Sequence, residues 1–500
     1  MSDTWRLCPM TGHSPARGVV GAPRLASASA TAAEAEAGAP GLLRALTPLL
    51  REWLPRQRWF AGKGQPITGF GLVCATELLP ADGGAGRPRL LHLLLDVHQD
   101  DTPPDCYQLL LGIRELLPPA LAPALIGHAV GGPLDGLTVF EGLHDPRLAT
   151  LLLERLRASG SAGHLRFSAE PDTAIPSGLA PRMSVAEQSN SSIIYGDTFI
   201  LKLFRRILPG CNPDLELSLA LARVGSTRVA APAAWFEAVG LHEEPATLGV
   251  LQRYLPGSSD GWELALQAVD ASGAQGDFAD GDFTKHAHAL GRATAEVHTA
   301  LADALPMTLL RRPQIQQLAA AMAGRLDSAV AAVPALGPYR TGLRDAFQDL
   351  AAFGAGGGTV RAQRIHGDLH LGQALLTPAQ GWVLIDFEGE PARPLAERRR
   401  PHSPLQDIAG MLRSFDYAAR HRDPTSPYAA DWAARHRTAY VAGYAERSGN
   451  DPNGSPVLLR AFETDKAVYE VVYEARHRPD WLPIPMAAIE RLCHPQPARP

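Results

Sequence analysis

Two short segments in the C-terminal half of the chain place two aspartates and an amide at close spacing. Residues 365–373 contain Asp368 and Gln373, and residues 383–391 contain Asp386 at the end of an apolar run. Gln373 follows Asp368 by five residues and precedes Asp386 by thirteen. A carboxylate that can receive a hydroxyl proton, followed by oxygens that can hold Mg2+, is typical of enzymes that transfer a nucleotide's phosphoryl group. The chain is therefore expected to fold around a phosphoryl-transfer site.

Each polar group of these segments has an expected role in that chemistry. Asp368 is the candidate catalytic base, which accepts or orients the proton of the attacking hydroxyl. Gln373, Asp386 and Glu388 are the candidate metal ligands, because amide and carboxylate oxygens are the hard donors that Mg2+ prefers. His370 is a candidate substrate contact. These residues predict a kinase that uses ATP and Mg2+.

Length and composition limit the alternatives. Five hundred residues exceed one ordinary hydrophobic core and indicate two or three domains. A net charge of −5 does not indicate binding to nucleic acid, which favours basic proteins. No apolar run reaches the roughly 18 residues that span a bilayer. Five scattered cysteines without a C-x-x-C pair, and an N-terminus without a basic region before an apolar one, predict a cytoplasmic location.

The residue pattern predicts an α+β fold in four parts. Residues 1–40, rich in Ala, Gly, Ser and Pro, are expected to form a disordered or weakly helical tail. A helix at 42–53 and strands at 89–97 and 107–114 predict a small α+β unit within residues 41–180. Residues 181–256 and 257–500 are expected to form the small lobe and the mostly helical large lobe of a bilobal kinase. Helices of the large lobe are expected at about 284–304, 313–333, 340–353, 404–421, 429–448 and 456–477.

The expected small lobe has a recognisable order of elements. It begins with a strand at 183–186 and a polar turn at 187–192, followed by a hairpin over 193–204. Asn212 and Pro213 supply an N-cap and a first-turn proline for a helix that ends near residue 223. Strand, loop, hairpin and helix in this order are typical of a kinase small lobe.

The nucleotide phosphates are expected to contact the polar turn. Neither G-x-x-x-x-G-K-[S/T] nor G-x-G-x-x-G occurs in the chain. Hydroxyls, amides and backbone N–H groups are available instead from Gln188, Ser189, Asn190, Ser191 and Ser192. This difference disfavours a protein kinase and favours a metabolite kinase.

Lys202 stands on an otherwise apolar strand, where a charge is costly unless it is paired. Nucleotide phosphates are one expected partner, and Glu216, one turn into the following helix, is the other. The alternative is a lysine whose ammonium reaches solvent from an edge strand.

Together the segments resemble a known family, the maltokinases, which are relatives of the aminoglycoside phosphotransferases. The resemblance rests on Leu54–Lys63, Glu187–Ser192, Asn212–Glu216, His366–Gln373, Asp386–Pro391, Asp407–Phe415 and Lys466–Glu474. It implies a protein kinase-like fold with an N-terminal cap region. It also implies ATP-dependent phosphorylation of maltose at its anomeric hydroxyl, giving maltose 1-phosphate for α-glucan and glycogen synthesis, and an association with trehalose synthase or other glucan-pathway enzymes.

The candidate substrate residues lie near the C-terminus. Lys466, Tyr469, Glu470 and Tyr473 are spaced i, i+3, i+4 and i+7, so a helix would present them on one face. Aromatic rings beside charged groups suit the C–H face and the hydroxyls of a sugar. The alternative is a tyrosine stripe packed in the helical core. Weaker candidates for the rim of the site are Trp481 and the basic run 398–400.

Three functions remain open from the sequence. A maltose kinase is the leading prediction. A glucosamine or other aminosugar kinase is the nearest rival, and its substrate's amino group would require an added carboxylate in the pocket. A non-catalytic nucleotide-binding scaffold is a rival of another class, against which the retention of Lys202, Asp368, Gln373 and Asp386 argues.

Overall fold

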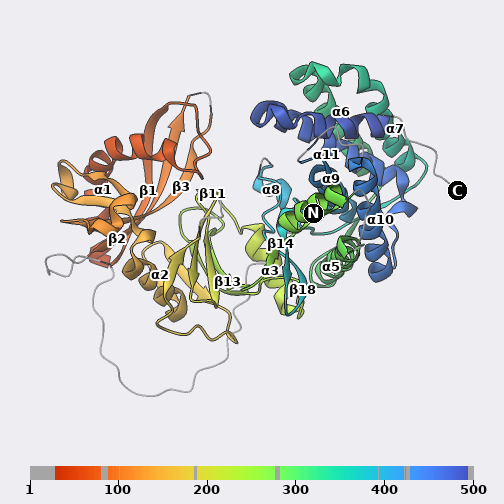
Figure 1. Cartoon of the computed structure of the whole chain (residues 1–500). Coiled ribbons are helices and arrows are strands. Elements are labelled where there is room, and N and C mark those ends of the chain that lie inside the picture. Colours follow the sequence, from red (N-terminus) through yellow and green to blue (C-terminus); the bar gives the residue numbers. More distant parts are fainter. Residues whose placement is uncertain are drawn as a thin grey trace, which may run out of the picture. The chain divides into compact units, whose positions relative to one another are not determined.

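The computed structural model describes residues 29–79, 88–100, 102–184, 189–275, 282–391, 393–421, 423 and 428–493 (Figure 1). The chain forms two compact units. The first comprises the described residues up to Asn212 together with Pro232–Tyr254, and the second comprises Pro213–Ala231 and the described residues from Leu255 onward. No helix among the described residues is long and apolar enough to cross a membrane.

The first unit begins with an antiparallel sheet covered by a helix. The order of its strands is β1-β2-β3-β5-β4, and β11 pairs with β3. The bounds are α1 (Ser29–Trp53), β1 (Ile67–Leu79), β2 (Arg89–Gln99), β3 (Asp105–Arg114), β4 (Leu125–His128), β5 (Thr138–Glu141) and β11 (Arg206–Ile207). Helix α1 begins at Ser29, so part of the expected tail is helical, while residues 1–28 lie outside the described part.

Strand β2 explains why this sheet has two buried faces. Leu91, Leu93 and Leu95 pack in the core that also contains Leu46 and Leu50 of α1. The alternate residues, Leu90, His92 and Leu94, are also buried. Because strand side chains alternate between faces, a run that is apolar at both phases requires cover on both sides.

The second sheet of this unit has the antiparallel order β6-β7-β12-β13-β10-β9-β8. Its strands are β6 (Gly160–Ala162), β7 (Leu165–Ala169), β8 (Pro181–Met183), β9 (Ser191–Tyr195), β10 (Phe199–Leu203), β12 (Pro232–Ala238) and β13 (Ala246–Arg253), and helix α2 (Pro146–Ala158) precedes them. The predicted hairpin is present as β9 and β10, joined at Gly196, which has a positive φ of 57°. The predicted turn at 187–192 is wrong for Ser191 and Ser192, which belong to β9.

The second unit is mostly helical, as the sequence predicted. Its helices are α3 (Pro213–Arg223), α4 (Gly261–Gln275), α5 (Asp282–Ala304), α6 (Arg312–Ala332), α7 (Arg340–Ala355), α8 (Leu395–Arg398), α9 (Pro404–Arg420), α10 (Ala429–Ser448), α11 (Pro456–His477) and α12 (Pro483–Cys493). Its short strands are β14 (Ser259–Asp260), β15 (Thr308–Leu310), β16 (Val360–Ala362), β17 (Ala374–Thr377) and β18 (Gly381–Leu384). Every residue of α9 from Asp407 to Ala419 is buried, so this helix forms the centre of the unit.

Candidate active site

The loop that carries Asp368 connects β16 to β17 and is fixed by a buried aspartate. Asp407, on α9, accepts hydrogen bonds from the backbone N–H groups of His366 and Gly367, both at 2.8 Å. Its Oδ2 atom also lies 3.0 Å from Nε2 of His298. Burial alone would raise the pKa of the Asp407 carboxyl, but the hydrogen bond with His298 holds it below its usual value. A charged anchor thus fixes the backbone immediately before the candidate base.

Gly367 allows this loop to approach the second catalytic segment. Its φ of +86° is in the region that favours glycine, and an added Cβ would lie 3.1 Å from the Cα of Gly389. His366 completes the contact by donating from Nε2 to the carbonyl of Ile385 at 2.8 Å. The two segments that the sequence singled out therefore lie against each other in the second unit.

Asp368 is paired with a lysine that the sequence assigned to substrate binding. The Nζ atom of Lys466, on α11, lies 3.1 Å from Oδ1 of Asp368, and the two side chains are 27% and 24% exposed. Burial by itself would raise the pKa of the Asp368 carboxyl, but the charges of Lys466 and His370 outweigh it and hold the pKa below its usual value. The candidate base is therefore ionised at neutral pH.

A cavity of about 210 Å³ opens beside this ion pair. Asp465 of its wall is held by a two-pronged ion pair with Arg325, at 2.8 Å for both hydrogen bonds. Glu390, which is 6% exposed, accepts one hydrogen bond from Arg393 at 3.0 Å through Oε2. The charged and aromatic residues of the wall are Arg325, Asp368, Glu390, Arg393, Asp407, Phe462, Asp465, Lys466 and Tyr469.

Glu390 keeps hydrogen-bonding capacity in this wall. Its Oε1 atom is buried and receives no hydrogen bond of good geometry from the described residues. Tyr469 is the neighbouring donor: burial, the Glu390 charge and a hydrogen bond with Glu390 raise the pKa of the Tyr469 phenol. Glu390 thus already has Arg393 and Tyr469 as partners, and its carboxylate still lines the cavity. This feature favours an acceptor that carries a donor, or a positive charge, at that point.

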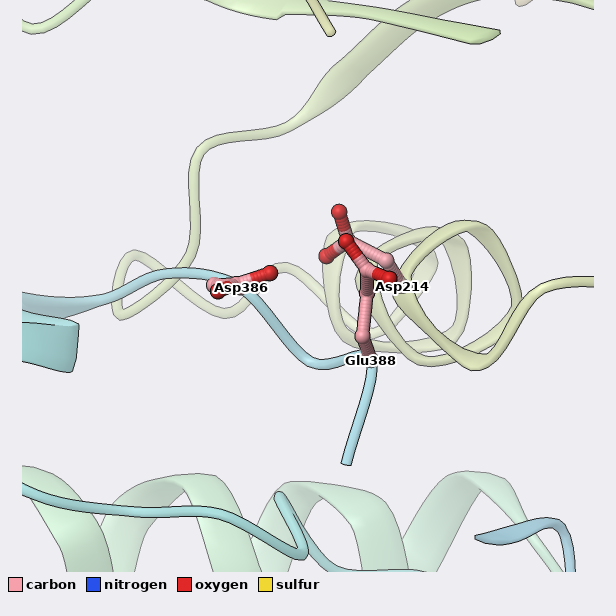
Figure 2. A group of neighbouring side chains, drawn as sticks. All are labelled: Asp214, Asp386 and Glu388. Atoms are coloured by element: carbon pink, nitrogen blue, oxygen red, sulfur yellow. The ribbon is translucent and has the colours of Figure 1, made fainter. Parts of the chain in front are cut away.

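Three carboxylates form a candidate metal site. One oxygen each of Asp214, Asp386 and Glu388 lies within 4.8 Å of the others (Figure 2). Asp214 comes from the first turn of α3, and it also accepts the backbone N–H of Phe387 at 3.0 Å. The set consists of hard oxygen donors, which fits Mg2+.

Gln373 and Asp386 are joined directly. The Gln373 side chain donates from Nε2 to Oδ2 of Asp386 at 2.9 Å, so its own carbonyl oxygen can face a metal ion. Asp386 has a left-handed φ of +66°, which non-glycine residues adopt where the surrounding structure enforces it, often at functional sites. The structure therefore brings together the predicted ligands Gln373, Asp386 and Glu388 and adds Asp214.

Two of the predicted substrate residues on α11 face elsewhere. Lys466 and Tyr469 line the cavity, but Glu470 is buried outside its lining and pairs with Arg413 of α9 at 2.8 Å. Tyr473 is 41% exposed and stacks on Tyr469 with a centroid distance of 6.2 Å. Neither Glu470 nor Tyr473 belongs to the cavity wall, because the face from Lys466 to Tyr473 spans two helical turns and extends beyond the cavity.

The remaining candidates of the second unit have clear positions. His370 is not part of the cavity wall; its Nδ1 atom accepts the Gly372 N–H at 3.1 Å, and burial lowers its pKa. Arg398 donates to the carbonyl of Glu388 at 2.9 Å, so the basic run braces the metal-site loop. Trp481 packs against His421, away from the cavity.

The predicted nucleotide contacts belong mainly to the first unit. Ser189 is exposed and Asn190 half-buried, whereas Gln188 lies outside the described residues. Ser191 and Ser192 are buried in β9, so the structure does not support a direct phosphate contact from their hydroxyls. Lys202 is buried on β10, where it pairs in register with Ser192 and Val250.

Glu216 belongs to the second unit and has a partner there. Its Oε2 atom lies 3.0 Å from the guanidinium of Arg364. The expected ion pair between Glu216 and Lys202 joins residues of different units and stays a prediction.

Sequence reasoning missed several residues that shape the site. Asp214 carried little signal, because an acidic residue in the first helical turn is common for helix stability alone. Asp407 had a usable signal, since a charge within the apolar pattern of α9 requires a partner. Glu390 lay within the segment Asp386–Pro391 that carried the family resemblance but was assigned no role, and Asp465 gave no signal, because its position beside the cavity depends on how α11 packs.

An ionised aspartate beside a small cavity, with a carboxylate cluster in the same unit, is the arrangement that a phosphotransferase requires. Residues 173–449 match the model of the phosphotransferase enzyme family, and residues 53–145 match that of the maltokinase N-terminal cap domain. The chain belongs to this phosphotransferase family and carries an N-terminal cap of the maltokinase type.

Two relatives and one solved structure illustrate the similarity. The chain is 30% identical over 365 residues to a glucosamine kinase of Streptacidiphilus jiangxiensis, covering 67% of this chain and 81% of the relative. It is 29% identical over 327 residues to a glucosamine kinase of Mycolicibacterium smegmatis, covering 62% and 79%. A structure of glucosamine kinase in complex with glucosamine, ADP and inorganic phosphate superposes with a TM-score of 0.61 at 24% identity, covering 83% of this chain and 96% of that one.

Proposed function

We propose that the protein transfers a phosphoryl group from ATP to a hydroxyl of an aminosugar of the glucosamine type. Asp368 receives the hydroxyl proton, and Lys466 keeps that carboxylate ionised until it does so. Asp214, Asp386, Glu388 and Gln373 would hold Mg2+, which when bound neutralises charge on the nucleotide phosphates. We propose this reaction for the cytoplasm, the location that the cysteine pattern predicts.

The observation that carries the choice of acceptor is the cavity beside Asp368. Its volume of about 210 Å³ is below the ~300–1,000 Å³ of pockets for drug-sized ligands, which suits one sugar ring better than two. Glu390 contributes a buried carboxylate to the cavity wall, to which an ammonium group could bind. An aminosugar was expected to require an added carboxylate in the pocket, and Glu390 meets this requirement by its position in the wall.

Glu390→Gln tests this assignment because it removes the charge and keeps the shape. We expect kcat/KM for glucosamine to fall about 10- to 100-fold, the range for losing a charged hydrogen bond, while ATP affinity stays unchanged. Glu397→Gln is the matched control, since Glu397 is an exposed carboxylate seven residues away in sequence. Equal loss for glucosamine and for glucose in Glu390→Gln would contradict the assignment of the amine.

Maltose is a second candidate acceptor, and the match of residues 53–145 to the maltokinase cap favours it. With maltose, the reaction would give maltose 1-phosphate for α-glucan synthesis, and an association with trehalose synthase would follow. The rings of Tyr469 and Tyr473, stacked 6.2 Å apart, could then support the second glucose unit. A kcat/KM for maltose above that for glucosamine would select this candidate.

A further inference from the structure

The first sheet (β1 to β5 and β11) lies mainly within the residues matched as the cap, and we call it the cap sheet. It belongs to the same compact unit as the sheet that carries Lys202, and buried polar side chains connect the two sheets. Strand β11 continues from the end of β10 and pairs with β3 of the cap, with Arg206 opposite Tyr107 and Ile207 opposite Cys106. The chain thus passes from the candidate nucleotide-binding strand directly into the cap sheet within four residues.

Gln108 of β3 holds two adjacent strands of the second sheet. Its fully buried side chain donates from Nε2 to the carbonyls of Phe204 and Leu248, both at 2.8 Å. Phe204 directly follows β10, and Leu248 lies in β13 next to Gly249, the partner of Leu203. His92 lies 2.9 Å from Oε1 of Gln108, so that oxygen is satisfied as well. One cap side chain therefore fixes the end of the strand that carries Lys202.

Arg205 makes the complementary connection from the second sheet. Its side chain is 2% exposed, and Nε donates to the Ser191 hydroxyl at 2.8 Å. Its guanidinium also lies 3.3 Å from Glu141 of the cap and 4.7 Å from the ring centroid of Trp59. Separating a buried guanidinium from such partners destabilises the folded protein strongly, so the Arg205 side chain has one favoured position.

The positions of Ser191 and Lys202 connect this network to nucleotide binding. Ser191 is the first residue of β9, directly after Ser189 and Asn190, the described candidates for phosphate contacts. Across the hairpin, Ser191 pairs with Leu203 and Ser192 pairs with Lys202. Arg205 and Gln108 therefore hold β9 and β10 next to Asn190 and Lys202, the residues that would contact phosphate.

We infer that the cap is a positioning element for the nucleotide: through Gln108 and Arg205 it fixes strands β9 and β10, and with them the positions of Ser189, Asn190 and Lys202, and so sets the affinity for the phosphates of ATP. Contacts to a ligand require placement within about 0.5 Å, which a strand end without these anchors would not retain. The inference rests on the proposed use of ATP and is independent of the acceptor sugar. It also gives a role to Trp59, in the Leu54–Lys63 segment that the catalytic chemistry does not use.

Calorimetric titration of the full-length protein tests the inference with two probes, Mg2+ with a non-hydrolysable ATP analogue, and adenosine. Arg205→Met and Gln108→Glu should each raise the Kd of the ATP analogue about 10-fold and leave the Kd of adenosine unchanged, because adenosine has no phosphates. Arg205→Lys keeps the charge and should fall between Arg205→Met and the wild type. Partial unfolding would instead lower the number of sites for both probes at unchanged Kd.

Arg114→Met is the matched control. Arg114 pairs with Asp145 at 2.9 Å, both side chains are nearly buried in the same unit, and neither belongs to β9 or β10. This variant should lower Tm without changing the Kd of the ATP analogue. If Arg205→Met and Gln108→Glu kept the wild-type Kd values while Tm fell as in Arg114→Met, the inference would be overturned and the proposed function would stand. A wild-type protein that binds no ATP analogue would overturn the proposed function and, with it, this inference.

Discussion

The ammonium of Lys466 lies 3.1 Å from the carboxylate of Asp368, so the candidate base has a positive charge as its immediate neighbour. A base held in its ionised form is ready to receive a proton, but it is also a weaker base than a free aspartate. In phosphoryl transfer this is sufficient, because positioning of the hydroxyl and charge stabilisation contribute more than proton removal. Lys466 therefore has two roles: it lowers the pKa of Asp368, and it lines the cavity.

Removal of that charge should be visible in the pH profile. Lys466 holds the Asp368 pKa below its usual value, so Lys466→Met should raise this pKa and move the acidic limb of kcat/KM to higher pH. The plateau should also fall by about 10- to 100-fold through loss of a charged hydrogen bond. Lys466→Arg should restore the limb, and Lys285→Met, at an exposed site on α5, should leave it in place. An unmoved limb in Lys466→Met would show that Asp368 does not govern it.

Asp368→Asn should nearly abolish turnover while leaving nucleotide binding intact. The amide keeps the size of the side chain but cannot receive the hydroxyl proton, and general-base groups contribute about 10²- to 10⁴-fold to rate. The checks are steady-state ADP release and titration with an ATP analogue. Wild-type turnover in this variant would mean that another group is the base.

Asp386→Asn and Asp214→Asn should each weaken the Mg2+ dependence of the reaction. Both carboxylates belong to the cluster within 4.8 Å, so the Mg2+ concentration for half-maximal rate should rise about 10- to 100-fold. Gln373→Leu should cause a smaller rise, because it removes an orienting hydrogen bond to Asp386 together with one amide oxygen. An Asp214→Asn variant with wild-type Mg2+ dependence would exclude Asp214 as a ligand and leave it as the acceptor of the Phe387 N–H.

His92 should make the protein less stable in acid. Burial lowers its pKa from 6.5 to about 4, so between these values the unfolded chain binds a proton that the folded chain does not. The free energy of unfolding should fall as pH falls from about 6.5 to 4, by roughly 3 kcal/mol at most from this residue. In His92→Gln the decline should be shallower, whereas His98→Gln, at an exposed site on the same strand, should follow the wild type. Parallel curves for His92→Gln and wild type would contradict this.

Most of the long helices of the second unit were predictable because local signals determine them, whereas α4 and α12 were not predicted. The expected helix at 404–421 is α9, which ends at Arg420 and begins after Ser403, whose hydroxyl accepts the Leu405 N–H. The expected helix at 456–477 has the bounds of α11. Apolar spacing, an N-cap and a first-turn proline all act within a few residues, so a sequence displays them directly.

The acceptor cavity was not predictable for a related reason. Spacing placed Lys466 and Glu470 on one face of α11, but their targets, Asp368 and Arg413, are residues distant in the chain. Ser191 likewise follows polar residues in the sequence, and only the tertiary structure places its hydroxyl against the buried Arg205. Which polar group finds an ion-pair partner is a tertiary property, and here it changed the favoured acceptor from maltose to an aminosugar.

The most direct test is ADP release by the purified protein with Mg-ATP, measured across glucosamine, maltose, glucose and trehalose at equal concentrations. The cavity beside Asp368 and Glu390 predicts the highest kcat/KM with glucosamine. Turnover with maltose and none with glucosamine would contradict the assignment of Glu390 to an amine, and silence with every sugar would contradict the sugar kinase itself.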